Sequence, residues 1–117
     1  MKITVIGTGY VGLVSGVCLA SRGHRVVCID LKPEIIESLN AGRPTIYERG
    51  LEALLTEVRA SGLFAVSDDL PAHLADTDVA MIAVGTPSVD GAMDLSQVLG
   101  AATAIGGFLR EDRKSVV

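Results

Sequence analysis

The sequence predicts an α/β fold, a doubly wound parallel sheet that breaks off at the start of its fifth strand. Short apolar runs rich in β-branched residues alternate along the chain with segments of helical spacing, as strands and crossover helices do. Hydrophobic residues make up 49% of the chain and aromatic residues only 3%. Such an aliphatic composition suits a sheet that helices cover on both faces. The 117 residues leave room for one domain with one sizeable core.

The first thirty residues predict two strands joined by a glycine turn and a helix. An apolar run over 3–6 is short enough for one buried strand, and Gly7-Thr8-Gly9-Tyr10-Val11-Gly12 follows it directly. A helix is expected from this turn to about residue 22, and a second strand over 25–29 ends in Asp30.

Each part of this unit suits the binding of a dinucleotide. The first glycine allows a tight bend, the second lets a pyrophosphate approach the backbone, and the third lets the helix pack close to the strand. The helix directs its free N–H groups and the positive end of its dipole at the phosphates. Asp30 follows the turn at about the distance, roughly 20 residues, at which a carboxylate accepts hydrogen bonds from the adenosine ribose. The unit therefore predicts a dinucleotide-binding site, and not glycines that serve only a tight turn.

The remaining chain continues the alternation of helices and strands. Pro33 suits the first turn of a helix. Residues 43–50 have no helical or strand period, so they are expected to form a long loop, and long loops in compact domains often carry function. Ser67 or Asp68 is expected to cap a short helix, and a polar loop is expected to run through Asp90-Gly91. Further helices are expected over 34–39, 51–61 and 95–109, and the short helix after Ser67 or Asp68 is expected to run to about residue 75. Further strands are expected over 63–66, 78–84 and 115–117.

The order of the strands places the ligand site. Right-handed crossovers give the order 3-2-1-4, with the fifth strand beside the fourth. The fourth strand is apolar on both faces and belongs near the centre. Ligands of such sheets bind where the order reverses, outside the carboxyl ends of strands one and four. Gly85-Thr86-Pro87 should therefore face the glycine turn at 7–12 across one crevice, with Asp30 beside it.

Composition and charge exclude several classes of function. The net charge of −4, with no cluster of Lys or Arg, argues against nucleic acid as a partner. No apolar run approaches the roughly 20 residues that span a bilayer, so no membrane partner is expected. Met1-Lys2 leads directly into a strand, which leaves no signal peptide and favours the cytoplasm.

The cysteines and histidines do not indicate a metal or a catalytic site. Cys18 and Cys28 lack a metal-ligand spacing and are expected to be small buried hydrophobes in a reducing compartment. His24 follows the glycine that ends the first helix, and His73 falls in a short polar helix, so both are expected to be structural residues at the surface. No metal site is predicted.

Several segments of the chain form a combination of motifs. They are the run from Ile6 to Leu13 with Gly16-Val17-Cys18-Leu19-Ala20 and Ile29-Asp30, then Ile46-Tyr47-Glu48-Arg49-Gly50-Leu51, then Ala83-Val84-Gly85-Thr86-Pro87, and Asp94-Leu95-Ser96. Together they resemble the amino-terminal domain of the nucleotide-sugar dehydrogenases, the UDP-glucose and GDP-mannose 6-dehydrogenase family. Residues 46–51 resemble the Y-E-P-G-L loop of the family, 83–87 resemble its V-G-T-P turn, and 94–96 resemble the D-L-S sequence that opens its next helix. The resemblance covers essentially the whole chain.

This resemblance implies a Rossmann-like domain that binds NAD. Members of the family oxidise the C6 alcohol of a nucleotide sugar to a carboxylate, in two hydride transfers through a thioester on a catalytic cysteine. By similarity the pyrophosphate of NAD would contact Gly7, Gly9, Tyr10, Val11 and Gly12. Asp30 would bind the adenosine ribose, and Val84, Gly85, Thr86 and Pro87 would bind the middle of the cofactor.

The chain departs from the family at two positions. The family commonly has Lys or Arg five residues after the acid, where this chain has Ile35. Lys32 is the candidate cofactor-binding residue in its place, and the alternative is a solvated turn residue. The family has Pro before Gly50, where this chain has Arg49, and the loss of the fixed φ loosens the loop.

The family's catalytic cysteine, its lysine, asparagine and acid partners, and the sugar-nucleotide pocket are expected beyond residue 117, so no catalytic residue is predicted in this chain. Residues 1–117 are interpreted as the NAD-binding domain of a longer enzyme, a homo-oligomer whose missing carboxy-terminal part binds the nucleotide sugar. The fragment alone is expected to be inactive. The Gly7-Thr8-Gly9-Tyr10 sequence favours UDP-glucose as the substrate, with GDP-mannose or another UDP-sugar as the alternatives.

An alternative from another class is a nucleotide-sensing regulatory module, like those that gate potassium transport. Such modules share the glycine turn, the acid and about this length. They do not need the loop at 46–51 or the turn at 85–87, and they end naturally, whereas this chain stops at a beginning strand. The combination favours the enzyme.

Overall fold

The computed structural model describes residues 1–93, 95–107 and 115–117. Its helices are α1 (Tyr10–Ser21), α2 (Pro33–Asn40), α3 (Leu51–Ala60), α4 (Leu70–Leu74) and α5 (Ser96–Gly106). Its strands are β1 (Lys2–Ile6), β2 (Arg25–Ile29), β3 (Phe64–Ser67), β4 (Val79–Ile82), β5 (Ser88–Val89), β6 (Ala92–Met93) and β7 (Ser115–Val116). The predicted alternation is confirmed, with boundaries that differ by a few residues.

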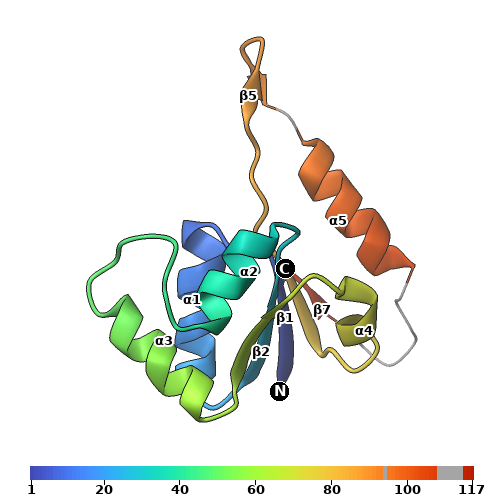
Figure 1. Cartoon of the computed structure of the whole chain (residues 1–117). Helices are drawn as coiled ribbons and strands as arrows, with labels where there is room; N and C mark the ends of the chain where they lie inside the picture. The colour runs from blue at the N-terminus through green and yellow to red at the C-terminus, as the bar shows by residue number, and fades with distance from the viewer. Residues whose placement is uncertain (94, 108–114) are drawn as a thin grey trace.

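The described strands, apart from β5 and β6, form one parallel sheet in the order β3-β2-β1-β4-β7 (Figure 1). This is the predicted doubly wound order, with the last strand beside the fourth. Ile6, the last residue of β1, is level with Ile29 on β2 and with Ile82 on β4. The carboxyl ends of these three strands therefore meet at one edge of the sheet, where the order reverses.

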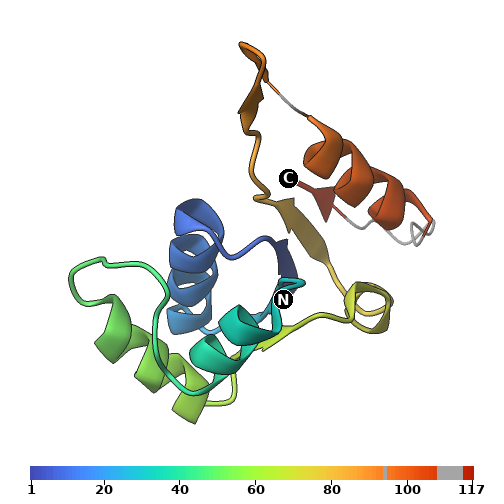
Figure 2. The same ribbon diagram turned by 45° about the horizontal axis from the view of Figure 1, so that its top comes forward.

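Helices cover the sheet on both faces: α1, α2 and α3 lie on one side, and α4 and α5 on the other (Figures 1 and 2). Side chains of β1 alternate between the two sides. Ile3 and Val5 belong to the larger core, with Leu13 and Val17 of α1. Ile6 belongs to the smaller core on the opposite side, which also contains Leu74, Ala80, Ala101 and Ile105.

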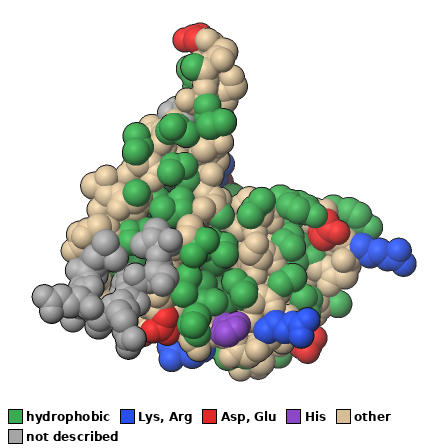
Figure 3. Space-filling model, turned by 180° about the vertical axis from the view of Figure 1, so that it is seen from behind, with side chains coloured by type: hydrophobic (Ala, Val, Ile, Leu, Met, Phe, Trp, Pro, Cys, Tyr) green, Lys and Arg blue, Asp and Glu red, His purple; other side chains and the backbone are tan. Residues whose placement is uncertain are grey.

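Large apolar side chains are exposed on and near the hairpin of β5 and β6 and on α5. Figure 3 shows hydrophobic side chains that run from the hairpin of β5 and β6 down the body of the molecule. The exposed large apolar residues are Val89 and Met93 on the hairpin, Leu95 just before α5, and Leu99 on α5.

The segment after β4 differs from its prediction. β5 and β6 pair antiparallel, with Val89 opposite Ala92, and project from the body (Figure 1). Asp90 and Gly91 between them have φ angles of 52° and 79°, and two positive values are what a type I′ hairpin turn requires. The expectation of a polar loop here is wrong, because the Asp-Gly pair closes a hairpin.

Two local expectations are also wrong. The residue that caps α4 is Asp69, whose carboxylate accepts a hydrogen bond from the Ala72 N–H at 3.2 Å. The expected caps, Ser67 and Asp68, do not have this role. Cys18 is exposed on α1, whereas Cys28 is buried as expected. The helix residues expected at 108–109, the connection at 110–114 and Asp94 lie outside the described residues.

Candidate functional site

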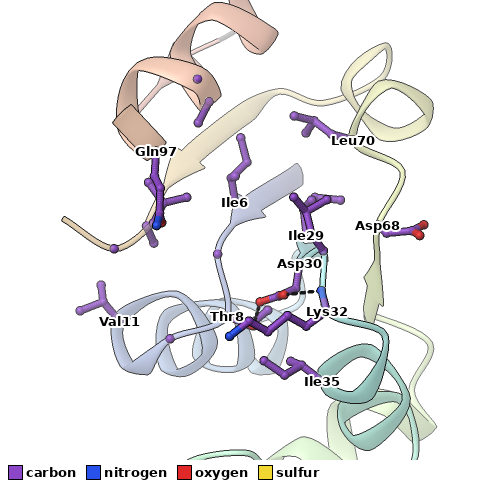
Figure 4. A pocket seen from close by; sticks show the side chains of 18 of the residues that line it. Ile6, Thr8, Val11, Ile29, Asp30, Lys32, Ile35, Asp68, Leu70 and Gln97 are labelled. Carbon is purple, nitrogen blue, oxygen red and sulfur yellow. Dashed lines mark hydrogen bonds between the residues drawn. The ribbon is translucent and has the colours of Figure 1, made fainter. Parts of the chain in front are cut away.

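A pocket of about 1200 Å³ opens at the edge where β1, β2 and β4 end (Figure 4). It receives residues from the glycine turn at 7–12, from the segment after β2, from the loop before α3, and from α4 and α5. The lining is Ile6, Gly7, Thr8, Gly9, Tyr10, Val11, Ile29, Asp30, Leu31, Lys32, Ile35, Thr45, Ile46, Asp68, Leu70, Ala83, Val84, Gly85, Gln97, Gly100, Ala101 and Ala104. The pocket is where the strand order predicted it.

The first and third glycines of the turn allow close packing. Gly7 has a φ of 110°, and a Cβ there would lie 2.3 Å from the carbonyl oxygen of Ala83. A Cβ on Gly12 would lie 2.2 Å from the carbonyl oxygen of Gly7. Both distances are far below van der Waals contact, so only glycine lets α1 and β4 approach the turn this closely.

Gly9 is different, because its Cβ position is open. No atom lies within 4 Å of a Cβ built there, and no side chain caps α1, which begins at the next residue. The first N–H groups of a helix have no partner inside the helix, and they carry the positive end of its dipole. The space over Gly9 therefore suits a phosphate or another anion.

Asp30 is held from two sides beside this space. One carboxylate oxygen accepts a hydrogen bond from the hydroxyl of Thr8, and the other accepts one from the backbone N–H of Lys32 at 2.9 Å (Figure 4). The Asp30 N–H donates to the carbonyl of Ser67 at 3.0 Å. These contacts fix the position of the carboxylate at the end of β2.

The residues after Asp30 form the adjoining wall. The side chain of Lys32 runs beside Asp30 toward Thr8 (Figure 4). Ile35, where the resemblance predicts Lys or Arg, also lines the pocket and makes this part of the wall apolar. Among the described residues that line the pocket, Lys32 is the one with a positively charged side chain.

The loop before α3 is tied to the start of α1. The Tyr10 hydroxyl donates a hydrogen bond to the carboxylate of Glu48. This hydrogen bond, and secondly the negative charge of Glu48, raises the pKa of Tyr10 above its usual value. Thr45 and Ile46 of the same loop line the pocket, so the contact helps to position one of its walls.

The sequence of the whole chain, residues 1–117, matches the model of the NAD binding domain of the UDP-glucose/GDP-mannose dehydrogenase family. The chain belongs to this family. Its cofactor is NAD, and the open position at Gly9 beside Asp30 fits the diphosphate and ribose of this dinucleotide.

The chain is similar to dehydrogenases of two substrate classes. It is 51% identical over 112 residues to the UDP-glucose 6-dehydrogenase of Rhizobium meliloti, covering 94% of this chain and 26% of the relative. It is 40% identical over 120 residues to the GDP-mannose 6-dehydrogenase of Pseudomonas aeruginosa, covering 100% of this chain and 28% of the relative. The chain spans about a quarter of the length of these relatives.

Solved structures of the family have the same fold. A UDP-glucose dehydrogenase from Pyrobaculum islandicum superposes with a TM-score of 0.84 at 47% identity, covering 90% of this chain and 24% of that one. The GDP-mannose dehydrogenase of Pseudomonas aeruginosa, solved as a ternary complex, gives a TM-score of 0.90 at 40% identity, covering 96% and 26%. These likenesses confirm the Rossmann-like fold of this dehydrogenase domain.

The structure brings most of the predicted NAD-binding residues together. Those that line the pocket are Gly7, Gly9, Tyr10, Val11, Asp30, Lys32, Val84 and Gly85. Gly12 lies under the turn as a packing residue, and Thr86 and Pro87 are exposed just beyond the lining, on the way to β5. Their contacts with NAD stay predictions.

Sequence reasoning missed several lining residues of this domain. Thr8 lies between two glycines of the motif, yet the pattern gives no role to its side chain. Leu70 and Asp68 come from the segment around α4, which carries no motif. Gly100, Ala101 and Ala104 form a small-residue face of α5, and their helical spacing is the signal that could have indicated it.

The described residues supply no metal site, and the buried thiol among them is not activated. They contain no group of three His, Cys, Asp or Glu side chains that could hold a metal ion. Burial raises the pKa of the Cys28 thiol to about 12, so this thiol stays protonated at neutral pH. No helix in the described part of the dehydrogenase domain is long and apolar enough to cross a bilayer.

Proposed function

We propose that this chain binds NAD across the switch in strand order, as the cofactor-binding part of a 6-dehydrogenase that acts on UDP-glucose. The diphosphate would lie over Gly9, the adenosine ribose against Asp30, and the nicotinamide half beyond Gly85. One observation carries the proposal. The open Cβ position at Gly9 coincides with the uncapped start of α1 and shares a pocket with Asp30.

The residues of the pocket serve different parts of the ligand. Backbone N–H groups at the start of α1 bind the diphosphate oxygens. Asp30, which is only an acceptor when ionised, binds the ribose hydroxyls. The apolar wall of Leu70 and Ala101 suits the flat faces of adenine, and Val84 and Gly85 would contact the middle of the cofactor. Bound NAD supplies the hydride acceptor, and this chain holds and orients it.

The preference for UDP-glucose rests on similarity. Over the aligned residues, this chain is 51% identical to the Rhizobium meliloti UDP-glucose 6-dehydrogenase and 40% identical to the Pseudomonas aeruginosa GDP-mannose 6-dehydrogenase. The chain spans about a quarter of these relatives, so the nucleotide sugar would bind to other parts of a longer protein. GDP-mannose and another UDP-sugar are the alternatives.

We further propose that these 117 residues alone oxidise no sugar nucleotide. The reaction needs a thiolate nucleophile and a proton acceptor held beside the nicotinamide. The Cys28 thiol is buried and protonated, and Cys18 does not line the pocket. The longer enzyme is proposed to be a homo-oligomer in the cytoplasm.

Calorimetric titration of the chain with NAD and NADP tests the proposal. NAD should bind more tightly, because the 2′-phosphate of NADP would bring negative charge against Asp30. Two like unit charges about 4 Å apart repel by about 1 kcal/mol in water and about 4 kcal/mol near a protein surface. We therefore expect a preference of roughly tenfold or more. Equal or tighter binding of NADP would contradict the role of Asp30, and no binding of NAD would contradict the proposal.

A further inference from the structure

Thr8 lies between the first two glycines of the turn, with its side chain nearly enclosed at 5% exposure. Its hydroxyl donates to one carboxylate oxygen of Asp30, and the N–H of Lys32 donates to the other at 2.9 Å. The two donors belong to different segments, the glycine turn after β1 and the segment after β2. The Thr8 contact therefore connects the phosphate side of the pocket to its ribose side (Figure 4).

Two donors restrain the rotation of the Asp30 carboxylate. Each carboxylate oxygen has two acceptor positions, so each oxygen keeps one position for a ligand after it accepts its protein hydrogen bond. An acceptor pair that is fixed before binding loses less conformational entropy when the ribose hydroxyls arrive. The same restraint prevents the carboxylate from turning away from a 2′-phosphate.

From this geometry we infer that Thr8 is a positioning residue, which orients Asp30 toward the adenosine ribose and so sets the preference for NAD over NADP. The inference rests on the proposed function. Without the Thr8 donor, Asp30 is held from one side only, by the N–H of Lys32. The Lys32 side chain, which runs beside Asp30, can then attract a 2′-phosphate (Figure 4). The carboxylate of Asp30 can turn away, so it repels that phosphate less.

Thr8→Val and Thr8→Ser separate the hydroxyl from the shape of the side chain. Valine has nearly the shape of threonine and lacks the donor, whereas serine keeps it. Affinities for NAD and NADP are measured by calorimetry, with direct titration for NAD and competition for NADP. Thr8→Val should weaken NAD by roughly three- to tenfold, because the ribose must then order a carboxylate that is no longer held in place before binding. NADP should be weakened less, so the ratio of the two affinities falls, and Thr8→Ser should stay within about twofold of the original chain for both.

Thr4→Val is the matched control. Thr4 is fully buried in β1, and its hydroxyl shares a hydrogen bond of 2.7 Å with the hydroxyl of Thr77, away from the pocket. This variant should lower the melting temperature and leave the ratio of NAD to NADP affinity unchanged. If Thr8→Val does not fold, Thr8→Ala, which only removes atoms, takes its place.

The possible outcomes separate the inference from the proposed function. If the original chain does not bind NAD, both fail. If NAD binds and Thr8→Val leaves its affinity unchanged, only the role of Thr8 fails. Equal weakening of NAD and NADP, or equal weakening by serine and valine, also overturns the role of Thr8, because each shows that the hydroxyl does not act through Asp30.

Discussion

Gly9 and Gly12 belong to the same turn, and the structure predicts opposite effects when a side chain is added to each. A Cβ on Gly12 would lie 2.2 Å from the Gly7 carbonyl oxygen and 3.2 Å from the Ala83 Cβ. Relieving such overpacking costs about 1–3 kcal/mol or more. At roughly 4 °C per kcal/mol for a domain of this size, Gly12→Ala should lower the melting temperature by roughly 4–12 °C.

Gly9→Val should leave the fold nearly unchanged and remove NAD binding. No atom lies within 4 Å of its Cβ position, and its φ of −71° and ψ of −169° are open to any residue. We expect the free energy of unfolding to change by less than about 1 kcal/mol. Hydrogen bonds to a charged group contribute about 1.5–3 kcal/mol each, so losing the backbone contacts to the diphosphate should weaken NAD by roughly 100-fold or more.

Melting followed by circular dichroism and NAD titration by calorimetry, on the same samples, check both predictions. Gly106→Ala is the control, because its Cβ would also meet open space and it does not line the pocket. It should keep the affinity and should not lower the melting temperature, because alanine is a better helix former than glycine. A Gly9→Val variant that binds NAD as the original chain does would refute the placement of the diphosphate. A Gly12→Ala variant with an unchanged melting temperature would refute the packing argument.

Three further predictions concern stability, thiol reactivity and activity. Asn40→Ala removes the side-chain amide that bonds the Val66 carbonyl and N–H at 2.9 and 3.1 Å, and should lower the free energy of urea unfolding by roughly 1–3 kcal/mol; an unchanged midpoint would contradict this. A thiol reagent should modify Cys18 in the folded chain and Cys28 only after unfolding, because Cys28 is buried with a pKa of about 12; equal rates would contradict its burial. With UDP-glucose and saturating NAD the chain should form no NADH absorbance, and turnover that survives repurification would show catalytic groups within these residues.

The sequence predicted the part of the site that depends on local geometry. The unit β1–α1–β2 is built from neighbouring segments, and the spacing of its glycines and Asp30 reports backbone needs directly. The structure confirms that Gly7 and Gly12 must lack a side chain, since a Cβ on either would overlap a carbonyl oxygen. The strand order followed from right-handed crossovers, which leave few alternatives once the elements are in place.

The rest depended on contacts that a pattern does not contain. The Thr8 hydroxyl meets Asp30 only after β1 and β2 are paired, so no spacing indicates it. Cys18 was misplaced because α1, an almost wholly apolar helix, gives no charge by which to locate its exposed side. The hairpin at Asp90-Gly91 did have a signal, an Asp-Gly pair, but its two-residue strands are too short for a period to show.

The most direct test of the account is a two-dimensional ¹⁵N NMR titration of the chain with NAD. The account predicts the largest shifts at the backbone N–H groups of Gly9, Tyr10 and Val11, and at those of Asp30 and Lys32. It predicts small shifts on α3, which packs against α1 and contributes nothing to the lining of the pocket. A second, smaller pocket is lined by Val14 and Cys18 of α1 and by Leu51 and Leu54 of α3. Saturable shifts confined to that pocket, with none at Gly9 or Asp30, would contradict the claim that this edge of the sheet binds the cofactor.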